Sequence, residues 1–331
     1  MPGGAAAKQN IVSIVFSFRN EEANIEEMVR HLAAVFAPLD CDFEAIFVND
    51  DSTDRSVEIL ERLRRSDPRL KLVNMARRFG VYECQFAGIA HAAGDAVICM
   101  DADLQDPPEE IPGMIAKWRD GADVVYTVRS RRLGERPFKM WLTRQAYRVI
   151  RWLSEIDLPV NAGDFRLMSR RVVEVLLTLQ EHNPYTRGLV TWVGFKQVPH
   201  YYERKARHAG ETHMPLLRFS GPTSPLGTLV YAITSFSMKP LYLVAAAGLF
   251  GLFAALAGIV ALAVLCLLDV QAGPAWWLAA LGLFFWASLM FAAGLNGLYL
   301  ARVYRDVRGR PRYIVKDTSG IEKAPPAQIL R

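Results

Sequence analysis

The chain has little cysteine, and the cysteines are not spaced as a metal or disulfide motif. Its 331 residues include only Cys41, Cys84, Cys99 and Cys266, with no CxxC pair and no histidine at zinc-ligand spacing. This pattern excludes a disulfide-rich secreted scaffold and a zinc knuckle. We therefore expect reduced, mostly buried thiols in a cytosolic domain.

Glycine-rich phosphate loops are also absent. Neither GxGxxG nor GxxxxGK[ST] occurs, so the sequence supports neither a dinucleotide-binding fold nor a P-loop. We expect no signal peptide, because residues 1–9 are small and polar and the apolar run Ile11–Phe16 is short. A diphosphate ligand would have to be held by a metal and arginines rather than by a glycine loop.

Charge is missing from two long stretches. No Asp, Glu, Lys or Arg occurs from Leu241 to Leu268 or from Val270 to Ala301, although charged residues make up 22% of the chain. A helix needs about 20 apolar residues to cross a bilayer. The sequence therefore predicts a hairpin of two transmembrane helices, at 241–268 and 275–301, and excludes a fully soluble protein.

Basic residues lie on both sides of this hairpin, whereas residues 269–274 between its helices contain no Lys or Arg. The basic residues are Arg204, Lys205, Arg207, Arg218 and Lys239 before it, and Arg302, Arg305, Arg308, Arg310 and Arg312 after it. The positive-inside rule predicts a multi-pass protein of the inner (plasma) membrane with the N-terminal domain and both termini in the cytoplasm. The net charge of +5 lies beside the apolar runs, so we expect a lipid bilayer as partner and no nucleic acid.

Apolar strand-like runs alternate with amphipathic helical stretches in the first part of the chain. The expected strands are Ile11–Ser17, Phe43–Val48, Leu70–Met75, Ala96–Met100 and Asp123–Val128, and the expected helices are 22–37, 53–66, 81–93 and 108–119. This alternation predicts an α/β domain with a mainly parallel sheet covered on both faces. For residues 134–155 we expect a further amphipathic helix with a basic face, which suits either a membrane surface or an ordinary solvated face.

Acidic or basic residues follow every expected strand. They include Glu21, Asp50, Arg77 and Arg129, and the pair Asp101 and Asp103 directly after the fourth strand. Ligands bind outside the carboxyl ends of such strands, so this edge is the expected site. Two close carboxylates need a cation or a shared proton, and oxygen ligands suit Mg²⁺ or Mn²⁺.

These residues carry a resemblance to the polyprenyl-phosphate glycosyltransferases of inverting glycosyltransferase family 2. That group includes dolichyl-phosphate mannose synthase, the bactoprenyl glucosyltransferases and the undecaprenyl-phosphate formamido-arabinose transferase. The strings that carry the resemblance are DADLQDPPE at 101–109, AGDFRLMSRR at 162–171, RGLVTWVGF at 187–195 and SFSMKPL at 235–241. The match runs from about Ile11 to about Arg302.

The resemblance implies a nucleotide-sugar-binding domain of the GT-A type, followed by the hairpin. Residues 1–9 would be a flexible N-terminus, 10–212 the cytosolic catalytic domain, 213–240 an interfacial segment, and 302–331 a basic cytosolic tail. Self-association into a homo-oligomer is also compatible with the sequence.

The resemblance also implies a role for each site residue. The nucleotide-binding residues would be Glu21, Asp50, Arg77 and Asp101; the metal ligands Asp101, Asp103 and Gln105; the catalytic residues Asp103 and Asp164; and the lipid-phosphate ligands Arg129, Lys139, Thr143, Arg187 and Arg204. Alternatives remain open: Asp164 could be a structural partner of Arg166 or a helix cap, and Lys139, Arg187 and Arg204 could each be solvated or salt-bridged cations.

Three positions depart from the family pattern. Asp51 stands where the family usually has glycine, Arg78 where it has asparagine, and His213 in Gly210–His213 where it has lysine. A histidine binds phosphate only when protonated or through a neutral N–H, which leaves the role of this juxtamembrane loop open.

The reaction that the resemblance implies is the inverting, metal-dependent transfer of a sugar from a nucleotide-sugar, with UDP expected as the nucleotide, to polyprenyl (undecaprenyl) phosphate. The acceptor is already an anion, so no strong general base is required. The alternatives are an enzyme that uses GDP-mannose, like dolichyl-phosphate mannose synthase, and a non-catalytic membrane adaptor that binds nucleotide or lipid. A processive polysaccharide synthase is disfavoured because the chain has no Gln-x-x-Arg-Trp motif and too few spans.

Overall fold

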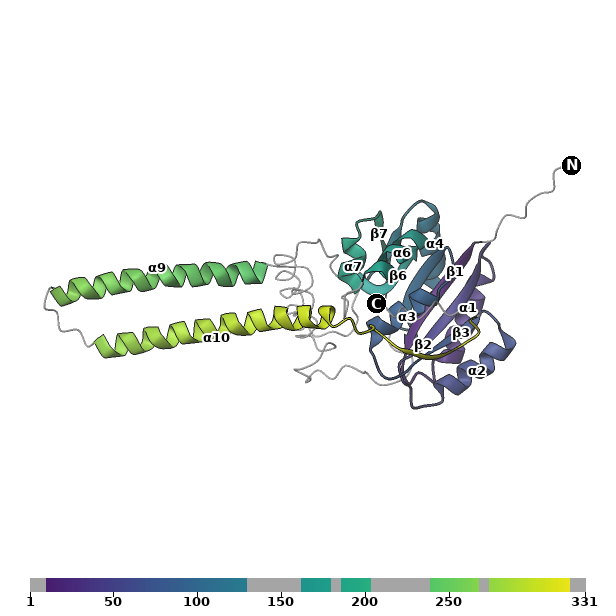
Figure 1. Cartoon of the computed structure of the whole chain (residues 1–331). Helices are drawn as coiled ribbons and strands as arrows, with labels where there is room; N and C mark the ends of the chain where they lie inside the picture. The colour runs from purple at the N-terminus through teal and green to yellow at the C-terminus, as the bar shows by residue number, and fades with distance from the viewer. Residues whose placement is uncertain (1–9, 130–161, 180–185, 204–238, 268–273, 322–331) are drawn as a thin grey trace.

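The computed structural model describes residues 10–129, 162–179, 186–203, 239–267 and 274–321, which form an α/β domain and two long helices that project from it (Figure 1). The strands are β1 (Ile11–Phe18), β2 (Asp42–Asn49), β3 (Leu70–Met75), β4 (Ala96–Asp101), β5 (Val124–Arg129), β6 (Ala162–Ser169), β7 (Gln197–Tyr202) and β8 (Val315–Ser319). The helices are α1 (Ile25–Phe36), α2 (Ser56–Ser66), α3 (Val81–His91), the 3₁₀ turn η1 (Pro108–Glu110), α4 (Ile111–Arg119), α6 (Arg170–Thr178), α7 (Thr186–Trp192), α9 (Lys239–Leu267) and α10 (Pro274–Val307).

The described strands form one sheet in the order β7-β5-β6-β4-β1-β2-β3-β8. β1 pairs in parallel with β2 and β4, β2 with β3, and β5 with β7, whereas β6 and β8 run antiparallel to their neighbours. The predicted α/β fold with a mainly parallel sheet is confirmed, and the arrangement is GT-A-like. All five expected strands and all four expected helical stretches are present, the last as η1 and α4.

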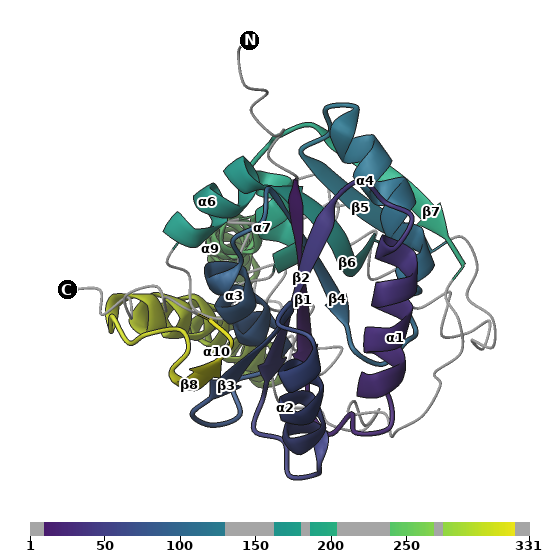
Figure 2. The ribbon, with the colours of Figure 1, turned by 90° about the vertical axis from the view of Figure 1, so that its right-hand side faces the viewer.

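Helices cover both faces of the sheet (Figure 2). α1, α2 and α4 pack with the alternate β1 residues Val12, Ile14 and Phe16 on one face. α3, α6 and α7 pack with Val15 and its neighbours on the other face. Because β1 is buried on both faces, its sequence is almost entirely apolar, as expected for a central parallel strand.

Helix α3 packs closely against the sheet. A Cβ atom added to Gly88 would be 2.3 Å from Val15 Cγ1 and 3.0 Å from Val48 Cγ2. Glycine at this position therefore lets the helix approach β1 and β2, and almost every residue of α3 is buried or half-buried.

Three strands were not predicted from the sequence. β6 contains the polar residues Asp164 and Arg166 together with Gly163, and it runs antiparallel between β4 and β5. β7 and β8 are polar or only partly buried. Their place in the sheet depends on partners far away in the chain, so the local hydrophobic pattern does not reveal them.

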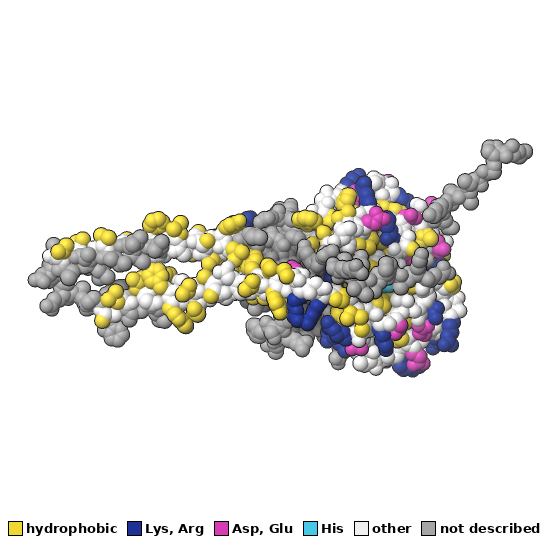
Figure 3. Space-filling view, viewed as in Figure 1, with side chains coloured by type: hydrophobic (Ala, Val, Ile, Leu, Met, Phe, Trp, Pro, Cys, Tyr) yellow, Lys and Arg dark blue, Asp and Glu magenta, His cyan; other side chains and the backbone are white. Residues whose placement is uncertain are grey.

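The two uncharged runs lie in α9 and α10, which run antiparallel (Figure 1). The helices touch near Gly251, where an added Cβ would be 3.3 Å from Phe285 Cε1. Apolar side chains on both helices are exposed, among them Phe250 and Phe291 (Figure 3).

One segment within the described residues, Phe284–Ala301, is long and apolar enough to cross a membrane, and Lys239–Gly251 is a shorter apolar segment. The first span of the predicted hairpin, at 241–268, and with it the two-span arrangement, therefore stays a prediction. Several expectations fall outside the described residues: the 134–155 helix, most of the 213–240 segment, and the loop around His213.

Candidate active site

The predicted site residues lie at one edge of the sheet. Ser17 of β1 pairs with Asp101, the last residue of β4, and Phe18 pairs with Asn49, which precedes Asp50. Arg129 ends β5, which is parallel to β4 through the intervening β6. The carboxyl ends of these strands therefore deliver their acids and bases to the same side, where ligands bind in open α/β sheets.

Glu21 is 8% exposed and connects two loops of this edge. Its backbone N–H donates to Ser56 Oγ at 2.9 Å, and its carboxylate accepts a hydrogen bond from Asn24 Nδ2 at 2.6 Å. The loop after β1 is further tied to the loop after β2, because Asn20 Oδ1 accepts from the Thr53 N–H at 2.8 Å.

Asp50 is buried and holds the loop that follows β3. Its Oδ1 accepts a hydrogen bond from Phe79 N at 2.6 Å, and Oδ2 accepts one from Gly80 N at 3.1 Å. Gly80 has a φ of 107°, in the region that favours glycine. Asp50 thus positions the Ala76–Gly80 loop, which contains Arg77, whose guanidinium lies 4.0 Å from the Phe79 ring centroid.

Asp51 explains one departure from the family pattern. Its φ is 60°, in the left-handed region. The glycine usual at this position adopts that conformation without cost, and aspartate tolerates it better than most residues. The turn is therefore retained with a side chain present.

Asp103 and Gln105 lie in a tight turn after β4. Asp103 is 5% exposed, and its Oδ1 accepts a hydrogen bond from the Gln105 N–H at 3.1 Å. Leu104 between them has a φ of 58°. The turn holds the Asp103 carboxylate just beyond the carboxyl end of β4, where Asp101 is the last residue of the strand.

This donor set fits a hard divalent cation. Among the described residues, no group of three or more His, Cys, Asp or Glu side chains is arranged to hold a metal. Mg²⁺ and related ions are often held by one or two carboxylates and complete their coordination with water and substrate phosphates. Asp101, Asp103 and the Gln105 side-chain oxygen would be the protein ligands in such a site.

Asp164 and Arg187 lie together. Arg187 donates from Nε to Asp164 Oδ1 at 2.9 Å and from Nη2 to Oδ2 at 2.7 Å. Arg166, which is 3% exposed, donates to the same Oδ1 at 3.1 Å. The structure thus shows the ion pair with Arg166 that the sequence left open as an alternative, and it joins Arg187 to that pair.

The Asp164 cluster is close to the end of β4. The antiparallel register pairs Cys99 with Arg166, and Asp101 and Asp164 each lie two residues beyond this pair, toward the same end of the two strands. Burial raises the pKa of the Cys99 thiol to about 12, and the charges of Arg166, Asp164 and Asp101 all act on this thiol. Asp164 and Asp101 therefore both lie near the buried Cys99 thiol, at the same end of β4 and β6.

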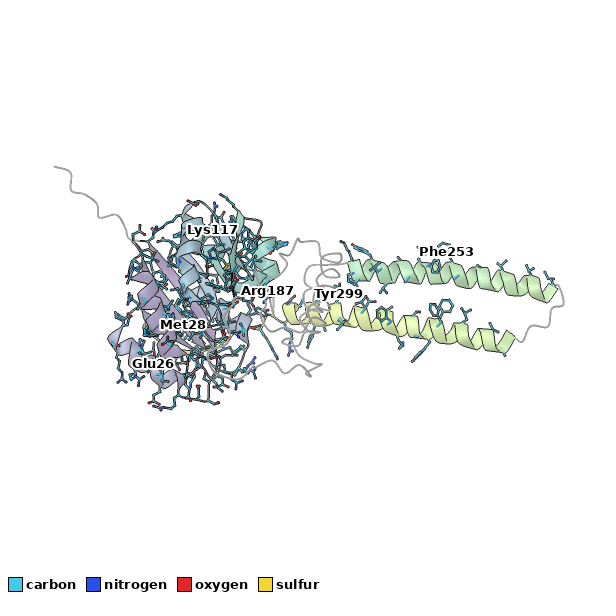
Figure 4. The ribbon with its side chains drawn as sticks, turned by 180° about the vertical axis from the view of Figure 1, so that it is seen from behind. Glu26, Met28, Lys117, Arg187, Phe253 and Tyr299 are labelled. Atoms are coloured by element: carbon cyan, nitrogen blue, oxygen red, sulfur yellow. The ribbon has the colours of Figure 1, made fainter. Side chains whose placement is uncertain are left out.

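This site lies toward the hairpin. Figure 4 places Arg187 on the side of the domain that faces the end of α10, where Tyr299 is labelled. Figure 3 shows Lys and Arg side chains gathered where α10 meets the domain, and Arg308 and Arg310 there are exposed. Lys139, Thr143 and Arg204 lie outside the described residues.

Glu83 and Arg312 were not predicted from the sequence as neighbours of this site. Glu83, in the first turn of α3, is 8% exposed, and burial raises its pKa to about 7. The nearby charges of Arg312 and Arg77 lower this pKa, and the charge of Asp50 raises it. An acid within an otherwise apolar helix is the signal that could have identified Glu83, whereas nothing local connects Arg312 to it.

Asp106 was also missed. It is 1% exposed and accepts a hydrogen bond from the Tyr202 hydroxyl of β7. The ring of Tyr202 in turn packs edge-on against Phe165 at a centroid distance of 6.0 Å. This contact connects the loop after β4 to β7, the strand at one edge of the sheet.

Known proteins match the chain over nearly its full length. An uncharacterized glycosyltransferase of Bacillus subtilis, YkcC, is 41% identical over 94% of this chain and 94% of its own length. The SfII prophage-derived bactoprenol glucosyl transferase of Shigella flexneri is 34% identical over 92% of this chain and 97% of its own.

A solved structure of glucosyl-3-phosphoglycerate synthase from Mycobacterium tuberculosis is 20% identical, with a TM-score of 0.48, and the match covers 68% of this chain and 79% of that one. The family described as Glycosyl transferase family 2 matches residues 13–177. With the near full-length relatives, this match shows that the chain is a glycosyltransferase and belongs to glycosyltransferase family 2.

Proposed function

We propose that the protein transfers a sugar from a nucleotide-sugar, with a UDP-sugar as the expected donor, to polyprenyl phosphate at the cytoplasmic face of a membrane. The observation that carries this proposal is the similarity to bactoprenol glucosyl transferases over 92% of the chain, hairpin included. Bactoprenol is a polyprenol, and its prenyl chain requires an enzyme that works at a bilayer. The site's position toward the hairpin supports the same conclusion.

The nucleotide would bind along the ends of β1 to β4. Arg77 on the Ala76–Gly80 loop and the acids Glu21 and Asp50 surround this part of the edge. A Mg²⁺ or Mn²⁺ ion held by Asp101 and Asp103 would neutralise charge on the diphosphate leaving group. The family resemblance supports this assignment, and the oxygen donors of the β4 turn suit such an ion.

The acceptor would bind beside β5, β6 and α7. Arg129 and Arg187 bring positive charge to this part of the edge, and their guanidinium groups suit a phosphate. The lipid phosphate is already an anion, so once aligned it can attack the anomeric carbon directly. Attack in line with the leaving diphosphate inverts the configuration of that carbon. Asp164, bonded to two guanidinium groups, would orient the sugar and its neighbouring arginines rather than remove a proton.

The test is transfer from radiolabelled UDP- and GDP-sugars to undecaprenyl phosphate by the full-length protein in detergent. We expect a chloroform-soluble product from one donor, lost with EDTA and restored by Mn²⁺ or Mg²⁺. Asp103→Asn should lower turnover at least a hundredfold, because it removes a charged ligand from the metal and diphosphate.

Glu109→Gln is the matched control, because Glu109 lies in the same string but is exposed and bonded to His31. It should keep activity within about twofold. Failure of every donor to give a lipid product, with nucleotide still bound, would support the non-catalytic adaptor instead.

A further inference from the structure

The chain returns from the membrane hairpin to the edge of the sheet. β8 pairs antiparallel with β3, with Asn74 opposite Asp317 (Figure 2). Beyond this pairing, the Ala76 N–H donates a hydrogen bond to the Ile314 carbonyl at 2.9 Å. The segment that follows α10 is therefore bonded to the start of the Ala76–Gly80 loop.

Arg312 in this segment lies against helix α3. Its guanidinium carbon is 4.2 Å from the ring centroid of Phe86, which is 1% exposed. An arginine over a buried aromatic face makes a favourable cation–π contact. The next residue, Tyr313, is half-buried against the apolar cluster that includes Phe86, and burial raises its pKa. Arg312 and Tyr313 thus both pack against the α3 side of the sheet.

Arg312 also affects the ionisation of Glu83, in the first turn of α3 beside the Ala76–Gly80 loop. Burial raises the pKa of Glu83, and the negative charge of Asp50 raises it further. The positive charges of Arg312 and Arg77 lower it. Glu83 lies one turn before Phe86 on α3, and α3 begins immediately after Gly80. Arg312 therefore contacts the helix that follows the loop, while Asp50 bonds the loop itself.

A second set of hydrogen bonds runs from β8 to the same edge. Asn74 Nδ2 donates to Asp317 Oδ1 at 2.6 Å, and Asn49 Nδ2 donates to Asn74 Oδ1 at 3.0 Å. The Ser52 N–H donates to Asn49 Oδ1 at 2.9 Å. The post-hairpin segment is thus connected to the loops after both β2 and β3.

We propose that Arg312 is a positioning residue of the donor site, through which the segment after the membrane hairpin holds the Ala76–Gly80 loop and the first turns of α3 in their nucleotide-binding arrangement. The proposal rests on the proposed function, which places the nucleotide at this loop. Arg312 acts through Phe86 and Glu83 and contacts no reacting atom itself.

The test measures binding of UDP, and of GDP in parallel, to the full-length protein in detergent with Mn²⁺ by titration calorimetry. Arg312→Gln should raise the Kd of the preferred nucleotide about tenfold. The donor KM should rise in proportion, while kcat at saturating donor stays within about twofold. Arg312→Lys, which keeps the charge, should recover most of the affinity.

Lys316→Gln is the matched control, because it removes one positive charge from an exposed position of β8. It should leave the Kd unchanged. If Arg312→Gln does not fold, Phe86→Leu removes the aromatic partner instead and should raise the Kd in the same direction.

A Kd equal to that of the unmodified protein in Arg312→Gln or in Phe86→Leu overturns the inference. A lower thermal stability with an unchanged Kd overturns it too, since that result would mark a purely structural contact. A protein that binds neither UDP nor GDP before any substitution would instead remove the proposed function, and the inference with it.

Discussion

Asp50 and Asp103 follow two parallel strands at the same edge, yet their surroundings differ. The Asp50 carboxylate accepts hydrogen bonds from two backbone N–H groups of the loop after β3. Asp103 accepts one from the Gln105 N–H within its own turn. Their position directly after parallel strands predicted that both belong to the site, whereas their hydrogen-bond partners show that Asp50 shapes a neighbouring loop.

Glu83 leads to a prediction about pH. Burial raises its folded-state pKa to about 7, from 4.5 in the unfolded chain. The folded state therefore keeps this proton as the pH rises from about 4.5 to about 7, and stability falls through that window. Glu83→Gln resembles the protonated acid and does not titrate. Between pH 5 and pH 8 the free energy of unfolding of the wild type should therefore fall by about 3 kcal/mol relative to that of the variant.

Denaturant unfolding of both proteins in detergent at pH 5 and pH 8 measures this difference. Glu58→Gln, on the exposed face of α2, serves as the control and should show no such change. A stability difference that is the same at both pH values would contradict the assignment of Glu83 as a buried, titrating acid.

At the scale of elements, α3 connects the core to the site. Its middle packs closely on β1 and β2 at Gly88, and its first turn follows the loop that Asp50 holds. The sequence predicted this helix at 81–93, and the structure confirms it at Val81–His91. The close approach was not predictable, because it depends on the valines of two strands that α3 meets only in the fold.

Gly88→Ala tests this packing. The added methyl group would overlap Val15 Cγ1, so the helix must move or the valines must change rotamer. We expect a loss of about 1–3 kcal/mol in unfolding free energy, which is the usual cost of overpacking a core. Gly248→Ala in α9, where nothing lies within 4 Å of the added atom, is the comparison. Equal stability of the two variants would show that α3 can shift at little cost.

For the whole molecule, the pairing of β8 with β3 constrains the topology. β3 belongs to the N-terminal domain and β8 follows α10, so both must lie on the same side of any membrane that α9 and α10 cross. This agrees with the positive-inside prediction from the basic residues on both sides of the hairpin. An even number of crossings satisfies both observations.

Reporter fusions test this arrangement in cells. Alkaline phosphatase, which is active only outside the cytoplasm, should be active when fused after residue 272 and inactive when fused after residue 331. A fluorescent protein that folds in the cytoplasm should give the reverse pattern. Alkaline phosphatase activity at both positions would rule out the two-span hairpin.

Local patterns in the amino-acid sequence predicted the order of strands and helices through β5, the uncharged runs of α9 and α10, and the edge where the acids and bases gather. These features follow from local periodicity and from the direction of parallel strands. The folded chain was needed to show the place of β6, β7 and β8, the pairing of Asp164 with Arg187, and the contact of Arg312 with α3. Each of these depends on residues distant in the chain, whose contacts no local pattern encodes.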